Sequence, residues 1–175
     1  MKIRNYEFKA KVDNIEKYEQ LLLKLNPVFK GIDHQIDTYF NANKGRLKLR
    51  EGNIENALID YCRGNKKGSK KSDIILYPHA PAEALKEILI HQFGIKIIVD
   101  KTRKIYFINN VKFHFDEVKE LGFFMEVEAI DADNKYSDEE LKEQCNYYYR
   151  YFEIRKEQIQ KLSYSDMLFS AVVGI

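Results

Sequence analysis

The chain carries little net charge and no long apolar run, and each absence excludes a class of protein. Lysine and arginine number 29, aspartate and glutamate number 27, and the net charge is only +2. This balance gives no general attraction to nucleic acid or to an anionic membrane surface. Every apolar run, such as YFINNVKFHF, is interrupted well short of a membrane span. We therefore expect no nucleic-acid partner and no membrane segment.

Cysteine is also scarce, which argues against a disulfide framework or a cysteine-rich metal site. The two cysteines, Cys62 and Cys145, lie far apart and lack the spacing of metal ligands. They are expected to be reduced thiols. The N-terminus passes directly into charged residues and has no apolar core of a secretion signal. Both observations predict a cytoplasmic protein.

The chain shows no linker, no low-complexity segment and no repeat of fixed period, so residues 1–175 are predicted to form a single domain. Helical spacing predicts helices at 14–25, 81–93 and 138–152 and in the tail at 156–173. Alternation of polar and apolar residues predicts about eight mostly antiparallel strands, a number consistent with a small closed barrel. The strands are expected at 2–12, 35–41, 45–53, 57–65, 73–78, 95–108, 111–118 and 120–130.

Several short signals support these boundaries. Asp13 is a plausible N-cap for the first helix, and Gly94 ends the second. Ser137 and Glu140 form a capping box at the start of the third helix. The pair at 109–110, Asn-Asn, predicts a hairpin turn.

What the sequence has in abundance is strands with one charged face and one apolar face. Successive side chains of a strand point to opposite sides, so EFKAK places its charged residues on one face. At least five strands follow this pattern, and the charges are sorted by sign within a strand. Like charges on one face destabilise each other, which makes such sorting unusual for an ordinary exposed surface. The charged positions are Glu7, Lys9 and Lys11; Arg46, Lys48 and Arg50; Lys101 and Arg103; Lys112, His114 and Asp116; and Glu126 and Glu128.

The pattern has two interpretations. In the first, the charged face of an ordinary sheet lies in water. In the second, the helices cover the apolar face of a closed sheet, and the charged face lines the inside of the barrel. Cationic and anionic walls facing each other would suit a polyphosphate and its divalent metal, because arginine and lysine bind phosphate oxygens and carboxylates bind Mg²⁺ or Mn²⁺.

The motifs, taken in order, resemble those of the CYTH domain, that is, of the triphosphate tunnel metalloenzymes. This superfamily includes class IV adenylyl cyclases, thiamine triphosphatases and inorganic triphosphatases. The resemblance rests on E-x-K-x-K at 7–11, then QIDTYF, GRLKLRE, LIDYCR, VDKTRKIYF, VKFHFDEVKELGFFMEVE and SYSDML. The whole set looks closest to the class IV cyclase-like branch.

The resemblance implies an α+β fold: a closed eight-stranded antiparallel β-barrel with helices packed on the outside, which holds a triphosphate and Mg²⁺ or Mn²⁺. It implies a metal-dependent enzyme that either cyclises ATP to cyclic AMP and pyrophosphate or hydrolyses an inorganic or organic triphosphate. By position, the catalytic and metal-binding carboxylates would be Glu7, Asp116, Glu126 and Glu128. The phosphate-binding side chains would be Lys9, Lys11, Arg46, Lys48, Arg50, Arg63, Lys101 and Arg103.

One residue departs from the family pattern. The family's opening motif is E-x-E-x-K, and Lys9 replaces its second glutamate, which changes the local charge by +2. A one-metal enzyme and a protein that binds nucleotide or polyphosphate without turnover are therefore the alternatives to a two-metal enzyme. A barrel that binds nucleic acid is ranked last, since leucines and not aromatics lie between Arg46 and Arg50.

Other residues are left with open interpretations. His114 is a candidate general base, although a histidine beside an aspartate is more often structural. Either Asp37 and Tyr39 or their neighbours face the lumen. The aromatic cluster at 147–152 is expected to combine barrel-packing core with a candidate homodimer surface. The basic loop KKGSKK at 66–71 is expected to be a solvated hairpin tip or a lid over the tunnel.

Overall fold

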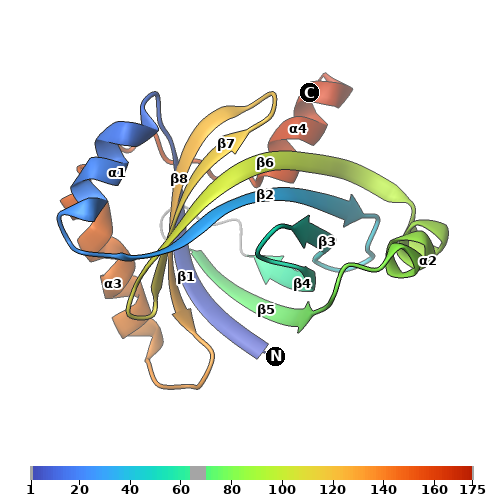
Figure 1. Cartoon of the computed structure of the whole chain (residues 1–175), viewed down its shortest axis with the longest axis horizontal. Coiled ribbons are helices and arrows are strands. Elements are labelled where there is room, and N and C mark those ends of the chain that lie inside the picture. The colour runs from blue at the N-terminus through green and yellow to red at the C-terminus, as the bar shows by residue number, and fades with distance from the viewer. Residues whose placement is uncertain (1, 64–69, 175) are drawn as a thin grey trace.

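The computed structural model describes residues 2–63 and 70–174, and within them eight strands close into one antiparallel barrel (Figure 1). The predicted fold class is confirmed. Around the barrel the strands follow the order β1-β5-β4-β3-β2-β6-β7-β8. Their bounds are β1 Lys2–Lys11, β2 Val28–Phe40, β3 Arg46–Gly52, β4 Ala57–Arg63, β5 Lys70–Pro78, β6 Ile95–Ile108, β7 Val111–Val118 and β8 Gly122–Asp131.

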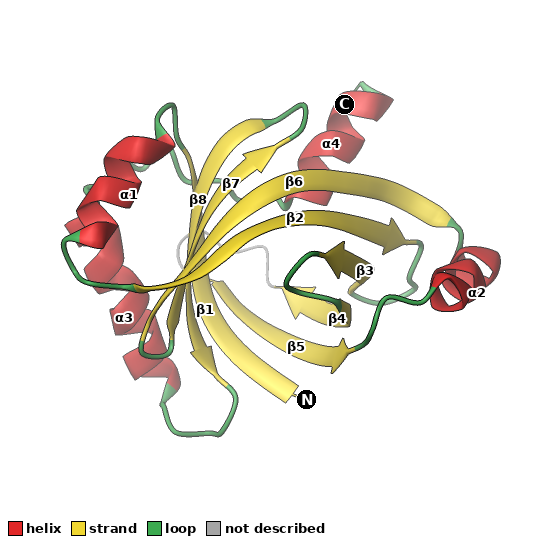
Figure 2. Cartoon of the chain, viewed as in Figure 1, coloured by secondary structure: helices red, strands yellow, loops and turns green. Residues whose placement is uncertain are grey.

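Four helices in the described residues lie outside the barrel (Figure 2). Helices α1 (Ile15–Leu23) and α3 (Asp138–Tyr151) lie side by side against one side of it. Helix α4 (Tyr164–Val173) packs near β6, and α2 (Glu83–Phe93) lies at the far end of β2 and β6. None of the helices in the described residues is long and apolar enough to cross a membrane.

The largest apolar core lies between the barrel and the α1/α3 side, not inside the barrel. Phe113 and Phe115 of β7 and Val127 of β8 are buried there with Leu141 and Phe152 from the α3 segment. Because side chains alternate along a strand, the charged neighbours of these residues must point inward. Of the two interpretations of the charged faces, the structure therefore supports the lumen.

The predicted helix over 156–173 is wrong in its first half. Ala10 forms an isolated bridge with Ile159, and the amide of Lys11 donates a 2.8 Å hydrogen bond to the carbonyl of Gln158. Residues 156–158 thus form a turn, the residues after it pair with the end of β1, and the helix begins only after its N-cap, Ser163. The hydrogen bonds offered by β1 are a tertiary effect that helical periodicity does not contain.

The other local signals are close to the observed structure. The first helix is capped by Asn14 and not by Asp13, and it ends two residues before the predicted boundary. The capping box of Ser137 and Glu140, the end of α2 at Gly94 and the turn between β6 and β7 are confirmed. Gly94 has a φ of 67°, a conformation that glycine adopts without strain. Residues 64–69, which hold most of the predicted basic loop, lie outside the described part of the chain.

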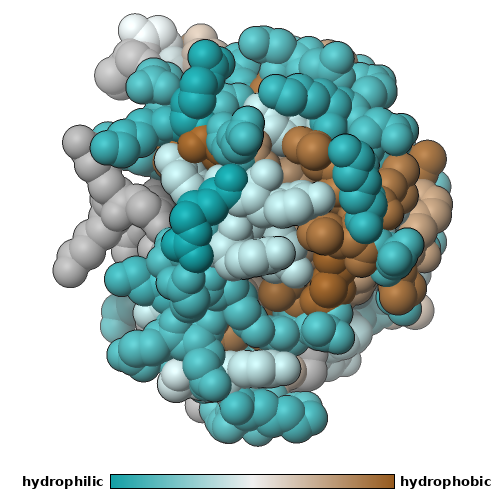
Figure 3. Space-filling view, turned by 90° about the vertical axis from the view of Figure 1, so that its left-hand side faces the viewer, coloured by the Kyte–Doolittle hydropathy of each residue, from teal (hydrophilic) through white to brown (hydrophobic). Residues whose placement is uncertain are grey.

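The aromatic cluster of α3 is divided between core and surface. Tyr148 and Phe152 are buried, whereas Tyr147 is 49% exposed and stacks against Tyr151. The space-filling view of this side shows an apolar area beside paler and hydrophilic surface (Figure 3). The homodimer surface stays a prediction. Cys62 is exposed, Cys145 is buried, and both are free thiols.

Candidate active site in the barrel lumen

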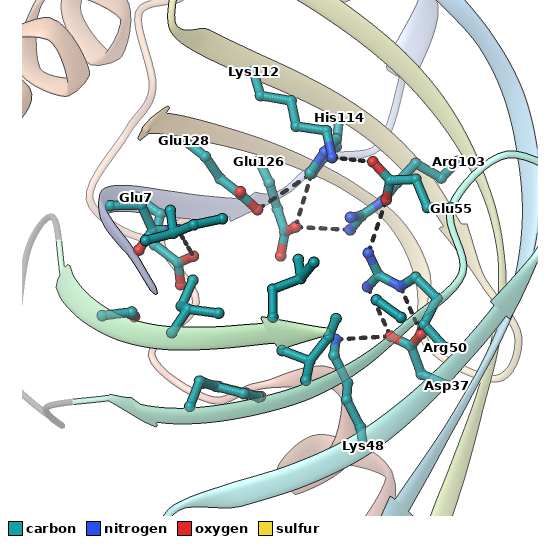
Figure 4. A pocket seen from close by; sticks show the side chains of 18 of the residues that line it. Glu7, Asp37, Lys48, Arg50, Glu55, Arg103, Lys112, His114, Glu126 and Glu128 are labelled. Atoms are coloured by element: carbon teal, nitrogen blue, oxygen red, sulfur yellow. Dashed lines mark hydrogen bonds and ion pairs between the residues drawn. The ribbon is translucent and has the colours of Figure 1, made fainter. Parts of the chain in front are cut away.

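The barrel encloses a cavity of about 460 Å³ whose charged lining comes from β1, β2, β3, β6, β7, β8 and the β3–β4 loop (Figure 4). This volume is within the range of small-molecule sites. The cavity brings together most of the residues that the sequence singled out. Those that line it are Glu7, Lys9, Lys48, Arg50, Lys101, Arg103, Glu126 and Glu128.

Three of the predicted residues lie outside this lining, and a fourth, Arg63, has no described side chain. Asp116 is fully buried behind Arg103. Arg46 pairs with Asp166 of α4 at 2.7 Å. Lys11 is exposed at the end of β1, with its ammonium 5.9 Å from the ring centre of Phe124. Arg63 ends β4, but its side chain lies outside the described residues.

One side of the lumen carries a cationic wall, formed by Lys48 and Arg50 of β3 and Lys101 of β6. All three surround one carboxylate, Asp37 of β2, which answers the open question of which β2 residues face inward. Lys101 lies 2.7 Å from Asp37, Lys48 lies 2.9 Å away, and Arg50 binds both carboxylate oxygens.

The cationic wall carries more positive charge than its own carboxylate can balance. Burial alone would raise the pKa of Asp37, but Arg50, Lys101 and Lys48 hold it well below its usual range, so the group is ionised. Glu55 pairs with Arg50 on the same side, so three cations face two carboxylates and leave an excess of one positive charge. An anion with several oxygens, such as a phosphate chain, fits this surplus.

The opposite side of the lumen carries an anionic wall, formed by Glu7 of β1 and by Glu126 and Glu128 of β8. Glu7 and Glu128 are direct partners across the β1–β8 ladder. Burial, followed by the charges of Glu7 and Glu126, raises the pKa of Glu128 to about 7. Opposed carboxylates destabilise each other unless a cation lies between them.

Glu126 differs from its neighbour because cations already pair with it. Lys9 lies 3.0 Å from one of its oxygens, and Arg103 lies 2.8 Å from the other. Although burial acts in the opposite direction, these cations hold the pKa of Glu126 well below its usual range. Lys9 also lies 3.8 Å above the ring of Tyr164. Lys9, which replaces the second glutamate of the family motif, therefore neutralises Glu126, one of the three carboxylates of the anionic wall.

Asp116 acts on the lumen through Arg103. Its two oxygens accept hydrogen bonds of 2.6 and 2.5 Å from this guanidinium, and one of them also accepts a 2.7 Å bond from the hydroxyl of Tyr164. Since Asp116 is fully buried behind the arginine, it is placed to orient a phosphate-binding group.

His114 is a neutral imidazole in this environment. Burial, together with the charges of Arg103 and Lys112, lowers its pKa to about 3. Its Nδ1 atom lies 3.3 Å from Glu126 and 3.5 Å from Glu128, and its buried Nε2 atom has no hydrogen-bond partner. A neutral histidine can bind a metal or orient a carboxylate, and the described contacts favour the second role.

Two further charged residues of the lumen were not singled out as site residues. Glu55, in the β3–β4 loop, pairs with Arg50 at 2.9 Å and with Lys112 of β7. The loop is held by the buried carboxylate of Asp33, which accepts hydrogen bonds from the amides of Ile54 and Glu55 at 2.9 and 3.0 Å. Lys112 shares a face with His114, so alternation could have identified it, but no sequence pattern points a loop residue such as Glu55 into the lumen.

The anionic wall fits a divalent metal ion. The ligand atoms of His114, Glu126 and Glu128 lie within 4.8 Å of one another, and Glu7 is beside Glu128. Carboxylate oxygens are the donors that Mg²⁺ and Mn²⁺ prefer. A cation here would also relieve the repulsion that raises the pKa of Glu128.

Comparison with solved structures shows that the fold is shared. The PH1012 protein of Pyrococcus horikoshii superposes with a TM-score of 0.77 at 24% identity, over 93% of this chain and 98% of that one. A candidate adenylate cyclase from Vibrio parahaemolyticus gives 0.75 at 15% identity, over 94% and 97%. A candidate adenylyl cyclase from Hippeastrum, described as having a dominant triphosphatase activity, gives 0.62 at 12% identity, over 98% and 96%.

Sequence comparison identifies the family. No curated protein matches the chain. The sequence profile of the CYTH domain, however, matches residues 4–162, which include β2 to β8, most of β1, and helices α1 and α3. The chain therefore belongs to the CYTH domain family.

Proposed function

We propose that the lumen binds a triphosphate together with one divalent metal ion and hydrolyses a phosphoanhydride bond. The observation that carries the proposal is the separation of charge. Three cations crowd one carboxylate on one wall, and two opposed carboxylates, Glu7 and Glu128, lie on the other. A metal–triphosphate complex has its own positive and negative ends and complements both walls.

The cationic wall would bind and orient the phosphate chain. Lys48, Arg50 and Lys101 would donate to phosphate oxygens, and Arg103, oriented by Asp116, would neutralise charge that develops during cleavage. Such positioning and charge stabilisation supply most of the catalysis in phosphoryl transfer.

Glu7 and Glu128, with Glu126 beside them, would hold the metal ion, Mg²⁺ or Mn²⁺. When bound, the ion lowers the pKa of an attacking oxygen and neutralises phosphate charge. In the hydrolysis, a water oxygen forms a bond to the terminal phosphorus and the bond to the bridging oxygen breaks. The products are orthophosphate, the diphosphate that remains of the substrate, and a proton, so no reactant other than water is needed.

Hydrolysis fits the lumen better than cyclisation of ATP. Cyclisation requires that a nucleoside be held so that its 3′ oxygen faces the α-phosphorus. Beyond the charged walls, the described lining combines aliphatic side chains with the polar side chains of Asn5, Asn56, Ser72, Ser163 and three tyrosines. Water as the attacking group makes no such demand.

Binding without turnover is the second candidate function, and Lys9 is the observation that favours it. Its ammonium lies 3.0 Å from Glu126, where the family pattern has another carboxylate. If the remaining carboxylates cannot hold a metal, the lumen would still bind a phosphate chain through its cationic wall.

The test is turnover of the purified protein with tripolyphosphate and with ATP in Mg²⁺ or Mn²⁺, with orthophosphate, ADP and cyclic AMP measured separately. We expect orthophosphate release that falls about 100-fold in Glu126→Gln/Glu128→Gln. Glu117→Gln, which removes an exposed carboxylate of β7, is the matched control and should retain activity. Cyclic AMP as the main product would show that the reaction is cyclisation of ATP and not hydrolysis. Tight binding of the triphosphate without any product would favour binding without turnover.

A further inference from the structure

One end of the lumen is lined by aliphatic side chains and not by charges. This aliphatic end consists of side chains from β1, the β3–β4 loop, β4, β5 and β8. They are Ile3, Ile54, Ile59, Ile74, Leu76 and Ile130. Neighbouring strands bring them together, since Ile3 lies opposite Ile74 and Ile59 lies opposite Leu76.

Apart from Ile59, which is buried, these side chains are only partly buried or are exposed. None of the six occurs in the three clusters of buried apolar residues found in the described chain, which lie between the barrel and its helices or around β2 and β6. Ile54 is 45% exposed, and the other five also face the cavity. Partly exposed apolar side chains that line a cavity indicate a ligand with apolar surface.

The boundary between the charged and aliphatic parts also points to a ligand. Asn5 of β1 is 2% exposed and lines the cavity, two residues before Glu7 and on the same face of the strand. Its amide oxygen is buried and has no hydrogen-bond partner. Buried polar atoms are nearly always paired, so this position is one where a ligand or its water would bond.

We propose that the substrate is a triphosphate ester of an aliphatic alcohol, an inference that rests on the proposed function. Its phosphates would lie between the cationic and anionic walls, and its hydrocarbon chain would lie along the aliphatic end. A nucleobase fits this end poorly, because its several donors and acceptors would be buried without partners. The aromatic side chains of the lining already have lysine partners. Lys48 lies 5.3 and 5.8 Å from the ring centres of Tyr39 and Tyr61, Lys9 lies 3.8 Å from that of Tyr164, and Lys112 lies 5.8 Å from that of Phe107.

The test is a series of binding measurements that do not depend on turnover. The probes are methylene-bridged, non-hydrolysable analogues of ethyl, butyl and hexyl triphosphate, with the corresponding analogues of tripolyphosphate and ATP for comparison, titrated by calorimetry in Mg²⁺. Burial of a methylene group strengthens binding about fourfold. We expect affinity to rise by about this factor for each methylene group added to the chain. The hexyl triphosphate analogue should also bind more tightly than the ATP analogue.

Two neighbouring isoleucines of β5 provide matched variants. Ile74 faces the lumen, whereas Ile75 is 52% exposed on the outside of the barrel. Ile74→Asn should abolish most of the gain with chain length and leave tripolyphosphate affinity unchanged, and Ile75→Asn should change neither. Ala57→Leu narrows the same end without adding a polar group and should also weaken hexyl binding selectively.

The outcomes separate this inference from the proposed function. Equal affinity across the series, or tighter binding of ATP than of hexyl triphosphate, would overturn the aliphatic substrate and leave the triphosphate site intact. Absence of binding by every probe would overturn both. Affinity that rises with chain length, in a protein without turnover, supports the inference and refutes the hydrolase.

Discussion

At the scale of single residues, we propose that Lys9 limits the number of metal ions that the lumen can hold. It lies directly opposite Glu126 in the β1–β8 ladder, and its ammonium pairs with that carboxylate. The pairing leaves Glu7 and Glu128 as the carboxylates that face each other across the β1–β8 ladder. We therefore expect one metal ion and not two.

Restoring the family's glutamate should restore a second metal. In Lys9→Glu, the ammonium beside Glu126 is replaced by a carboxylate, so two carboxylate pairs face the lumen. Calorimetric titration with Mn²⁺ should give one ion for the natural chain and two for the variant. Lys11→Glu makes the same change of charge at the exposed end of the same strand, and this variant should still bind one Mn²⁺ ion. An unchanged count in Lys9→Glu would show that this position does not set the stoichiometry.

Lys101 should make triphosphate binding depend on pH. Burial, with the charges of Arg50, Arg103 and Lys48, lowers its pKa to about 7 despite the attraction of Asp37. Above pH 7 the free protein therefore loses this cation, and a bound triphosphate would favour its return. Affinity for tripolyphosphate should fall as pH rises from 7 to 9, by up to about tenfold per unit.

The control for this prediction is Lys101→Arg, in which the side chain stays charged over the whole range. Calorimetry at several pH values compares the two proteins with the same ligand, so the ligand's own titration cancels. Parallel pH profiles in the two proteins would mean that Lys101 does not titrate with binding.

Alternation identified most of the charged lumen, but it could not identify residues placed by loops or by neighbouring charges. Lys48, Arg50 and Lys101 follow from the period of two in their strands. The inward direction of Asp37 became certain only from the three cations around it. Glu55 lies in a loop whose position depends on hydrogen bonds to Asp33, a contact between distant segments that no local pattern encodes.

At the scale of elements, the start of α4 links helix capping to the site. Ser163 caps the helix through a capping box with Asp166 and also lines the cavity. The next residue, Tyr164, donates to Asp116, which in turn orients Arg103. Loosening the first turn of α4 should therefore loosen the phosphate-binding guanidinium.

Two serine caps allow this link to be tested. Ser163→Ala in α4 and Ser137→Ala in α3 each remove an N-cap from a capping box and should each lower the free energy of unfolding by about 1 kcal/mol. Only Ser163→Ala should also weaken tripolyphosphate binding, by about fivefold. Denaturant unfolding and calorimetry measure the two effects. Equal tripolyphosphate affinity in the two variants would show that the first turn of α4 does not support phosphate binding.

Most strands and the capping box of Ser137 were predictable because their signals are local, and the tail was not. The segment before α4 has the spacing of a helix, yet it forms a turn and then pairs with the end of β1, because the amide of Lys11 and the carbonyl of Lys9 bond to it. Similarly, β2 begins at Val28, seven residues before its predicted start, where its long pairing with β6 extends it. Both differences come from tertiary hydrogen bonds.

At the scale of the whole molecule, the barrel places its charges inside and most of its apolar core outside. This arrangement was predictable from two facts together, namely strands with sorted charges and amphipathic helices that need an apolar surface. The closure between β1 and β8 and the change from charged to aliphatic lining along the lumen were not predictable, since both depend on register between distant strands.

The most direct test of the account is a crystal structure with Mn²⁺ and a non-hydrolysable tripolyphosphate analogue, in which anomalous scattering locates the metal. We expect one manganese peak between Glu7 and Glu128, and phosphate oxygens within hydrogen-bond distance of Lys48, Arg50 and Lys101. An empty lumen, or manganese and phosphate bound elsewhere on the protein, would contradict the central claim that the two charged walls form a metal–triphosphate site.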